Sequence, residues 1–500
     1  MSAYQKLLLE CYLIRDLQNI YALLDWDQQT YMPLNAANDR AAQLTTLAGL
    51  VHEKTVSCEF GRLLEQSEKE MKNADPDSDE KALLRVLRRS FDKEQKVPQK
   101  LIEQLAETAS NAHQAWVKAK ENRHFPTFAP LLEKLLDLRR EYAACFAPYD
   151  NIYDPLLDHF EEGCTSAALD VLFQQMQQEL VPLIRQITDA QQADDSFLHQ
   201  YYDPEKQLRF SEDILHRIGY DFTRGRQDQS VHPFTTGFGI NDVRITTKII
   251  PDQPTSVLLS SIHECGHALY EQGIAPHLNR TPLAEGVSLG LHESQSRLWE
   301  NQVGRSLPFW EYALPLFRNC FPEQLRGVSA RQLYAAVNKV QPSLIRTEAD
   351  EVTYNLHIIL RYEMEKELLT GKIAVRDAAE AWNEKSRKLL GITPDHDSDG
   401  ILQDIHWSMG EFGYFPTYAL GNIYAAMIWE KAEETIPGLN DSIRTGDFQP
   451  LLTFLRERIH CHGAKYTPLQ TLKLATGKDH IEPACLIRQF KQKYFALIQE

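Results

Sequence analysis

Apolar residues recur at the spacing of an α-helix along almost the whole chain of 500 residues. Residues 4–26 show the pattern clearly, because leucine, isoleucine and tyrosine return every three or four positions and form one wide stripe. Similar stretches cover residues 43–64, 81–91, 101–123, 128–145 and 166–190. Short polar or proline-containing breaks separate these stretches, and the acidic segment 74–80 offers several helix caps. The sequence therefore predicts a mainly α-helical protein.

One region breaks the helical pattern. Residues 220–250 are rich in threonine, valine, isoleucine and aromatic residues, and Gly237 and Gly239 mark turns within it. We expect two or three short strands here, forming a small β-sheet. The sequence contains no internal repeat, low-complexity tract or flexible linker, so we expect a single domain over residues 1–500.

The charge and cysteine content narrow the classes of partner and compartment. The chain has 53 basic and 70 acidic residues, a formal net charge of −17, which argues against nucleic acid as a partner because phosphate binding relies on lysine and arginine patches. Its 8 cysteines are scattered without C-x-x-C spacing, which is typical of free thiols in a reducing compartment. The N-terminal stretch lacks the features of a signal peptide, and no apolar run approaches the roughly 18 residues of a membrane span. We expect a cytoplasmic protein without a membrane partner.

The stretch 255–273 resembles a buried helix, yet it contains the sequence HECGH at 263–267. Buried imidazole and carboxylate groups are costly unless they are paired or bind a metal. His263 and His267 are four residues apart, so on a helix their rings project from one face and can reach the same metal ion. Glu264, next to the first of them, is then placed as a general base for water rather than as a ligand. The alternative is a pair of helix histidines with a purely structural role.

A second helix supplies a candidate for the third ligand. Thr281 and Pro282 predict an N-cap followed by proline at the first helical position, and we expect the helix to run to about Gly304. Glu293 lies 26 positions after His267 in this helix. Two histidines and a carboxylate that leave one position open are typical of a catalytic zinc site. The alternative for Glu293 is an ordinary solvated glutamate of the helix. The neighbouring His292 is a weaker candidate for a metal ligand.

These motifs, together with others along the chain, resemble the metallocarboxypeptidases typified by carboxypeptidase Taq. The motifs that match, in order, are HPF at 232–234, DVRIT at 242–246, HECGH at 263–267, HESQ at 292–295, IRTEADE at 345–351, GILQDIHW at 400–407 and GYFPTYALGN at 413–422. Weaker matches at 26–33, 153–163 and 459–466 extend the resemblance over nearly the whole chain. The match of several motifs in order is far more specific than HECGH alone.

The resemblance implies a metal-dependent enzyme that removes single residues from the free C-terminus of peptides. It implies one zinc or cobalt ion per chain, with His263, His267 and Glu293 as ligands and Glu264 as general base. It also implies a large multi-helix body with a deep active-site groove, and a homodimer. On this basis we expect a helical part at about residues 1–200 to cover the groove and a catalytic part at about 201–500.

Such an enzyme must also bind the free α-carboxylate of its substrate, and arginine suits this role because its guanidinium meets a carboxylate with two parallel hydrogen bonds. The candidates within the motifs are Arg346 and Arg244. The resemblance favours Arg346, with Tyr418 as a hydrogen-bonding companion. The alternative for each arginine is a structural ion pair, with Asp242 for Arg244 and with an acidic residue of 348–351 for Arg346.

Several further polar residues have roles that the sequence leaves open. His232 and His406 could stabilise the oxyanion of the tetrahedral intermediate or orient a metal ligand, and Asp404 could hold a ligand imidazole in its working tautomer. A packed, hydrogen-bonded histidine is the alternative for His406, which precedes Trp407. The H-x-H of His460 and His462 lacks a carboxylate partner in the pattern, so we interpret it as structural.

One position departs from a related class of metalloenzymes. In thermolysin-like enzymes an acidic residue four positions after the glutamate ligand supports a histidine, whereas this chain has Arg297 there. An acid that orients a histidine must then come from elsewhere, and IRTEADE is a candidate source. The departure argues against a thermolysin-type endopeptidase. A helical oligopeptidase that cleaves internal bonds of short peptides remains the alternative function.

Overall fold

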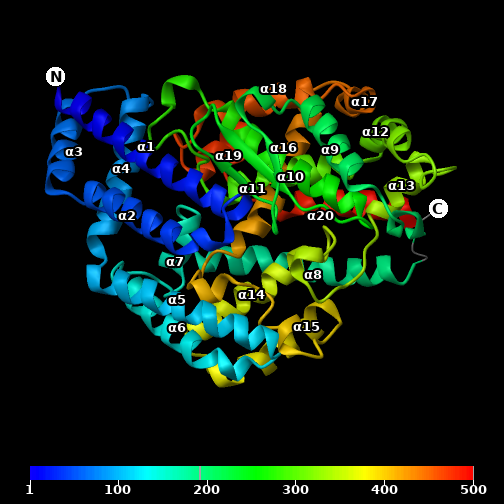
Figure 1. Ribbon diagram of the computed structural model, residues 1–500, viewed down its shortest axis with the longest axis horizontal. Helices are drawn as coiled ribbons and strands as arrows, with labels where there is room; N and C mark the ends of the chain where they lie inside the picture. The colour runs from blue at the N-terminus through cyan, green and yellow to red at the C-terminus, as the bar shows by residue number, and fades with distance from the viewer. Residues whose placement is uncertain (191–192, 499–500) are drawn as a thin grey trace. The chain divides into compact units, whose positions relative to one another are not determined.

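The computed structural model describes residues 1–190 and 193–498, and helices dominate it (Figure 1). The described residues form twenty α-helices, α1 to α20, and one small sheet, which confirms the mainly α-helical prediction. They divide into two compact units, each made of separate stretches of the chain. Unit 1 consists of residues 1–95, 194–337 and 427–480, and unit 2 of residues 96–193, 338–426 and 481–500.

Unit 1 contains the N-terminal helices and the region around HECGH. Its helices are α1 (Ala3–Thr30), α2 (Ala37–Thr55), α3 (Cys58–Glu70), α4 (Asp79–Lys96), α9 (Pro204–Ile218), α10 (Pro254–Gly273), α11 (Leu289–Arg297), α12 (Leu307–Cys320), α13 (Ala330–Val337), α17 (Leu439–Thr445), α18 (Gln449–Arg458) and α19 (Pro468–Thr476). The apolar stripes of α1, α3 and α4 meet in one buried cluster that includes Leu7, Leu64 and Leu83. Burial of these stripes, rather than helix propensity, accounts for most of their stability.

Unit 2 is built around one helix that is buried on nearly every side. Its helices are α5 (Gln99–Glu121), α6 (Ala129–Ala144), α7 (Asp154–Phe160), α8 (Ser166–Thr188), α14 (Tyr354–Leu369), α15 (Ala378–Leu390) and α20 (Pro483–Ile498). Thirteen side chains of α14 are buried, including the charged Arg361 and Glu365. A helix buried all round needs partners for its polar groups, and this requirement determines the surroundings of Arg361 described below. Helix α16 (Pro416–Thr435) contains residues of both units.

The predicted small sheet is present in unit 1. It has three strands in the order β1-β3-β2, formed by β1 (Gln227–Gln229), β2 (Thr235–Gly237) and β3 (Val243–Thr247). Strand β1 pairs with β3 in parallel and β2 pairs with β3 in antiparallel orientation. The sheet lies beside α10, which makes close contact with both β2 and β3 (Figure 1). The sheet therefore packs against one side of the helix that contains HECGH.

The structure corrects two predicted helices. The stretch 43–64 is two helices, because Ser57 caps a new helix by accepting a hydrogen bond from the Phe60 amide. The helix predicted from Pro282 begins instead at Leu289, where Ser288 accepts from the Leu291 amide. Its last part, Leu298–Gly304, is a π-helical turn, a feature frequently found at functional sites.

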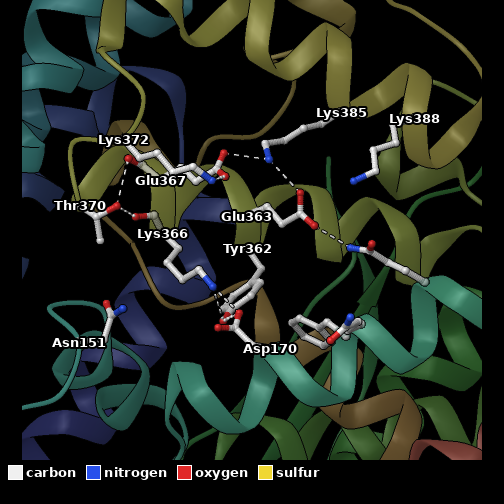
Figure 2. Close-up of a pocket in the computed structure, with 13 residues that line it drawn as sticks. Asn151, Asp170, Tyr362, Glu363, Lys366, Glu367, Thr370, Lys372, Lys385 and Lys388 are labelled. Carbon is white, nitrogen blue, oxygen red and sulfur yellow. Dashed lines mark hydrogen bonds and ion pairs between the residues drawn. The ribbon is translucent and has the colours of Figure 1, made fainter.

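Unit 2 has a polar surface pocket of about 470 Å³ between α8, α14 and α15 (Figure 2). Its carboxylates are already paired with neighbouring side chains: Lys385 bridges Glu363 and Glu367, and Lys366 pairs with Asp170. Because these charges satisfy one another, the pocket is a solvated network of ion pairs, and we assign no ligand to it.

Two findings bear on the expected compartment and partners. Within residues 1–190 and 193–498, no cysteine forms a disulfide. No helix in the same ranges combines the length and apolar character that crossing a bilayer requires. The buried cysteines, Cys11, Cys265 and Cys485, pack as small apolar side chains.

Candidate active site

Helix α10 places the two histidines of HECGH on one face. Pro254 occupies the start of the helix, where its missing amide hydrogen costs nothing, and most of the following residues are buried. One turn separates His263 from His267, and their ring centroids are 5.0 Å apart. Cys265, between them, is fully buried in the core.

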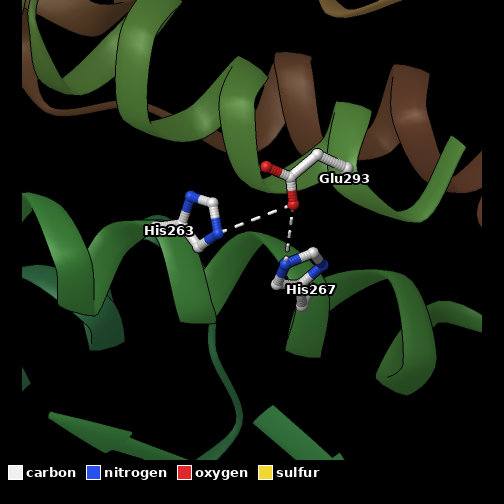
Figure 3. A group of neighbouring side chains, drawn as sticks. All are labelled: His263, His267 and Glu293. Atoms are coloured by element: carbon white, nitrogen blue, oxygen red, sulfur yellow. Dashed lines mark ion pairs between the residues drawn. The ribbon is translucent and has the colours of Figure 1, made fainter. Parts of the chain in front are cut away.

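Helix α11 brings Glu293 to the same point (Figure 3). Glu293 Oε2 lies 3.7 Å from His263 Nε2 and 3.4 Å from His267 Nε2. One ligand atom from each of the three residues lies within 4.8 Å of the others. The residues that the sequence proposed as a metal triad therefore converge, although one of the two helices begins seven residues later than predicted.

The triad fits a divalent metal ion. Nitrogen and oxygen ligands held at about 2.0–2.1 Å in a tetrahedron are themselves about 3.4 Å apart, close to the separations from Glu293 to the two rings. The donor set of two imidazoles and one carboxylate is that of a catalytic zinc-type site, which keeps a position open. His267 Nε2 and His263 Nε2 both face the Glu293 carboxylate, so the three potential ligand atoms border one space.

Gly266 is the reason that α10 and α11 approach so closely. A Cβ atom at this position would lie 2.6 Å from both the Gln295 carbonyl oxygen and the Ser296 Cα. We expect Gly266→Ala to lower the free energy of unfolding by about 1–3 kcal/mol, since the backbone of α11 must move. Denaturant unfolding would measure this change, and metal affinity should fall with it because Glu293 moves with α11.

Gly49→Ala is the matched control for this prediction. Gly49 lies in the exposed part of α2, and a Cβ there would meet no atom within 4 Å. Alanine at such a helical position should raise stability by about 0.5–1 kcal/mol. Equal effects of the two substitutions would contradict the packing argument.

Glu264 is a buried carboxylate adjacent to the triad, 7% exposed. Its Oε2 accepts a hydrogen bond of 2.6 Å from the Thr235 hydroxyl on β2, which fixes the carboxylate against the sheet. Burial raises the pKa of Glu264, although the charge of His263 and the Thr235 hydrogen bond act in the opposite direction. A carboxylate with a raised pKa is a better proton acceptor than an exposed one.

The ionisation of two members of the triad, His267 and Glu293, suits metal binding. Burial lowers the pKa of His267 to about 3, so its imidazole is neutral and has a lone pair available at neutral pH. Burial opposes ionisation of Glu293, but Arg297 and the two histidines outweigh it and hold the pKa of this carboxyl well below its usual range. Metal ligands must be deprotonated, and these two groups are.

Two residues beside the triad were not predicted as part of the site: Glu300 was missed, and Arg297 was named only as a departure from the thermolysin-like pattern. Glu300, in the π-helical turn, accepts a hydrogen bond of 2.9 Å from His263 Nδ1. Arg297 donates to Glu293 Oε1 at 2.7 Å and to Glu300 Oε2 at 3.1 Å. The acid in contact with a histidine of the triad from outside it is thus Glu300, seven residues after Glu293, rather than a residue of IRTEADE. The spacing of four and seven residues from Glu293, on one helix face, is the signal that could have identified both.

A comparison with models of protein families identifies the family of this chain. The family model described as carboxypeptidase Taq (M32) metallopeptidase matches residues 7–494. The chain belongs to this family. Thermostable carboxypeptidase 1 of Thermus thermophilus is 41% identical over 487 residues, 95% of each chain. Carboxypeptidase 1 of Bacillus subtilis is 37% identical over 474 residues, 95% of this chain and 94% of that protein.

A solved structure agrees with this assignment. The M32 carboxypeptidase of Deinococcus radiodurans R1 superimposes with a TM-score of 0.97 at 40% identity and covers 100% of both chains. As a member of the carboxypeptidase Taq family, the protein is a metallocarboxypeptidase that uses a divalent metal ion. The family assignment does not favour the alternative of a helical oligopeptidase.

In this carboxypeptidase, Arg346 belongs to a buried ion-pair group in unit 2. Its Nε and Nη2 each lie 2.9 Å from Asp404 Oδ1, and its Nη1 donates to the Tyr354 hydroxyl at 2.9 Å. The other oxygen of Asp404 accepts from Arg361 Nε at 2.6 Å. Asp404 therefore pairs with two guanidinium groups, and the group of three has one more positive than negative charge.

Tyr418 and His406 lie next to this group. The guanidinium of Arg346 lies 5.0 Å from the centroid of the Tyr418 ring, and His406 Nε2 is 3.4 Å from the Tyr418 hydroxyl. Burial lowers the pKa of His406 to about 4, so this histidine is neutral at pH 7 and leaves the charge balance unchanged. Arg346, Asp404, His406 and Tyr418, named separately from sequence motifs, are thus brought together, with Arg361 as an unpredicted fifth member.

Arg244 and His232 lie in unit 1. Arg244 forms a two-pronged ion pair with Asp242, both contacts being 2.9 Å, and its guanidinium lies 4.4 Å from the centroid of the Trp26 ring. This is the ion pair that the sequence offered as the alternative for Arg244. His232 has an exposed side chain in the connection between β1 and β2. The roles of both residues toward substrate stay predictions.

His460 has the structural surroundings that the sequence interpretation gave it. It is fully buried, and its Nε2 lies 2.9 Å from Gln295 Oε1 on α11. Its ring stacks on Tyr270 with centroids 5.1 Å apart, and Tyr270 stacks in turn on His292. This row of rings packs the C-terminal part of unit 1 against the helix pair that holds the triad.

Proposed function

We propose that this chain removes single residues from the free C-terminus of peptides, with Glu264 as general base. The proposal assigns His263, His267 and Glu293 as ligands of one zinc or cobalt ion. The observation that carries it is the convergence of these three side chains beside a buried carboxylate, in a chain of a metallocarboxypeptidase family. The family assignment supports the carboxypeptidase activity, and the choice of zinc or cobalt and the role of each residue belong to the proposal.

The chemistry divides between the metal and the side chains. A divalent ion held by the triad supplies Lewis-acid polarisation of the peptide carbonyl and makes water more acidic. Glu264 accepts one proton as a water molecule attacks the carbonyl carbon and a C–O bond forms. Glu264 then returns this proton to the amide nitrogen as the C–N bond breaks, which releases a neutral amine. The Thr235 hydrogen bond holds the carboxylate in one position during both transfers.

Arg346 and Tyr418 are proposed to bind the α-carboxylate of the substrate, and we call this pair the carboxylate clamp. The surplus positive charge of Arg346, Arg361 and Asp404 supports the assignment, because a buried charge excess is stabilised by an incoming anion. Arg346 is 7% exposed and keeps its charge at every accessible pH. His232 or His406 is proposed to stabilise the oxyanion.

A peptide ladder tests the proposed function. The protein is stripped of metal with a chelator, reloaded with zinc or cobalt, and incubated with a peptide of about ten residues as free acid or as C-terminal amide. We expect mass spectrometry to show stepwise loss of terminal residues from the free acid only. Internal fragments from both peptides, or no cleavage with either metal, would overturn the proposal.

We also propose a cytoplasmic homodimer. The absence of disulfides among the described cysteines supports a reducing compartment. Exposed apolar side chains along α1, including Leu9, Leu13 and Ile20 at 52%, 41% and 48%, support an interface on that helix. Light scattering after size-exclusion chromatography should give about twice the chain mass of 57.5 kDa, and a monomeric mass would exclude the dimer.

A further inference from the structure

Three charged residues follow one face of the helix that supplies Glu293. Arg297 is four positions and Glu300 seven positions after Glu293, so successive turns place them in a row. The last of the three lies in the π-helical turn Leu298–Gly304. Their side chains are nearly buried, with 8%, 14% and 11% exposure for Glu293, Arg297 and Glu300. Two buried carboxylates this close would repel each other, and the guanidinium between them removes that repulsion.

Each contact in this row constrains one atom of the triad. Glu300 accepts a hydrogen bond from His263 Nδ1 at 2.9 Å. The proton of a neutral ring therefore stays on Nδ1, and the lone pair of Nε2 faces Glu293. Arg297 donates a hydrogen bond to Glu293 Oε1 at 2.7 Å, which leaves Oε2 to face both histidines. Arg305 Nη2 lies 3.4 Å from the remaining oxygen of Glu300, so that carboxylate is itself held.

The second histidine of the triad is held differently. His267 Nδ1 is buried and has no hydrogen-bond partner among residues 1–190 and 193–498. Its ring stacks on that of His292, with centroids 4.4 Å apart and planes 15° from parallel. His292 in turn contacts Glu271 at 3.2 Å. A hydrogen bond to an acid outside the triad, Glu300, therefore orients His263, whereas ring stacking orients His267.

We propose that Glu300 and Arg297 are positioning residues of the metal site. Glu300 sets the tautomer and ring angle of His263, and Arg297 makes Glu293 a ligand through one oxygen. This inference rests on the proposed metal-binding role of the triad and deepens it. It explains why arginine stands where thermolysin-like enzymes have an acid: the orienting acid lies one turn further on, and the arginine connects it to the glutamate ligand.

Metal affinity and a cobalt spectrum test the inference without any peptide. Removal of an acid that supports a histidine ligand typically weakens metal binding by about 10- to 100-fold. We expect Glu300→Ala to weaken zinc binding by this factor in competition with a chromophoric chelator. Glu300→Gln should lose less, because its amide oxygen still accepts from His263 Nδ1. Glu311→Ala, which removes the exposed partner of Arg444 in the same unit, should leave zinc affinity unchanged.

Arg297→Met tests the second half of the inference. Once Oε1 of Glu293 is released, we expect the visible absorption of the cobalt-loaded protein to weaken as both oxygens of Glu293 bind and the coordination number rises. Zinc affinity of Glu300→Ala within twofold of the unmodified protein, or an unchanged cobalt spectrum in Arg297→Met, would overturn the inference.

Two further measurements keep the outcome decisive. If Glu300→Ala fails to fold, the Glu300→Gln protein decides, since it keeps the size and one acceptor of the side chain. If the unmodified protein binds zinc but releases no residue from peptides, the proposed function fails while the affinities still decide the positioning roles. Kinetics on loaded proteins should show Glu300→Gln lowering kcat with little change in KM, because the residue does not touch the substrate.

Discussion

Glu264→Gln should abolish most of the hydrolysis while leaving the metal bound. The amide has nearly the same shape as the carboxylate and can still accept from the Thr235 hydroxyl, but it cannot take a proton from water. Loss of a general base typically costs about 10²- to 10⁴-fold in rate, so we expect kcat to fall within this range. Release of terminal residues, followed by mass spectrometry, measures the rate, and metal content is measured on the same sample.

Glu293→Gln distinguishes the role of Glu293 as a ligand from that of Glu264 as general base. It should lose metal as well as activity, because an amide is a poorer ligand than the charged carboxylate. A Glu264→Gln protein that keeps more than a tenth of the activity would mean that another group is the base. One that loses its metal would mean that Glu264 is a ligand, and the assignment of the triad would have to change.

Arg346→Met is expected to weaken substrate binding more than it slows the reaction. The contact with the substrate carboxylate exists both in the bound substrate and in the transition state, so its loss should raise KM with little change in kcat. A charge-assisted hydrogen-bond pair contributes about 1.5–3 kcal/mol, and we therefore expect KM to rise by about 10- to 100-fold. Initial rates over a range of free-acid peptide concentrations measure both constants.

The same variant should lose its discrimination against amidated peptides. The ratio of kcat/KM for free acid to that for amide is expected to fall by the same factor, because only the free acid uses the charge of Arg346. Arg376→Met is the control, since Arg376 is an exposed arginine of the same unit, with 87% of its side chain accessible. An unchanged ratio would remove Arg346 from the carboxylate clamp and direct attention to Arg244.

The helical fold could be predicted because one rule of periodicity describes most of the chain. The exceptions arise where two caps compete. Thr281-Pro282 is as good a helix start in sequence as Ser288, but the Thr281 hydroxyl donates to the Leu278 carbonyl and accepts from the Leu283 amide, which closes a turn instead. The π-helical turn has no sequence pattern of its own, so the helix after Glu293 was expected to continue regularly.

The sequence could predict the parts of the candidate site that lie within one motif. It could not predict contacts between residues of different motifs as well. HECGH fixes the relative position of its residues by helix geometry alone. The pairing of Arg346 with Asp404, 58 residues away, depends on tertiary structure, and so does the competition of Arg361 for the same carboxylate. Glu300 was overlooked because a glutamate seven residues from a ligand is common on any solvated helix face.

The interleaving of the two units has a consequence for biosynthesis. The chain passes between them five times, so neither unit corresponds to a continuous fragment that could be expressed alone. Unit 2 requires α20, whose Lys493 and Tyr494 both bind the buried carboxylate of Glu351, five residues after Arg346. Among the helices of unit 2, α20 is synthesised last, and synthesis proceeds at about 5–20 residues per second. A nascent chain therefore completes the surroundings of Arg346 only after α20 has emerged, and a ribosome stalled before α20 emerges should hold a protein whose HECGH helix can form while unit 2 is still open to proteases.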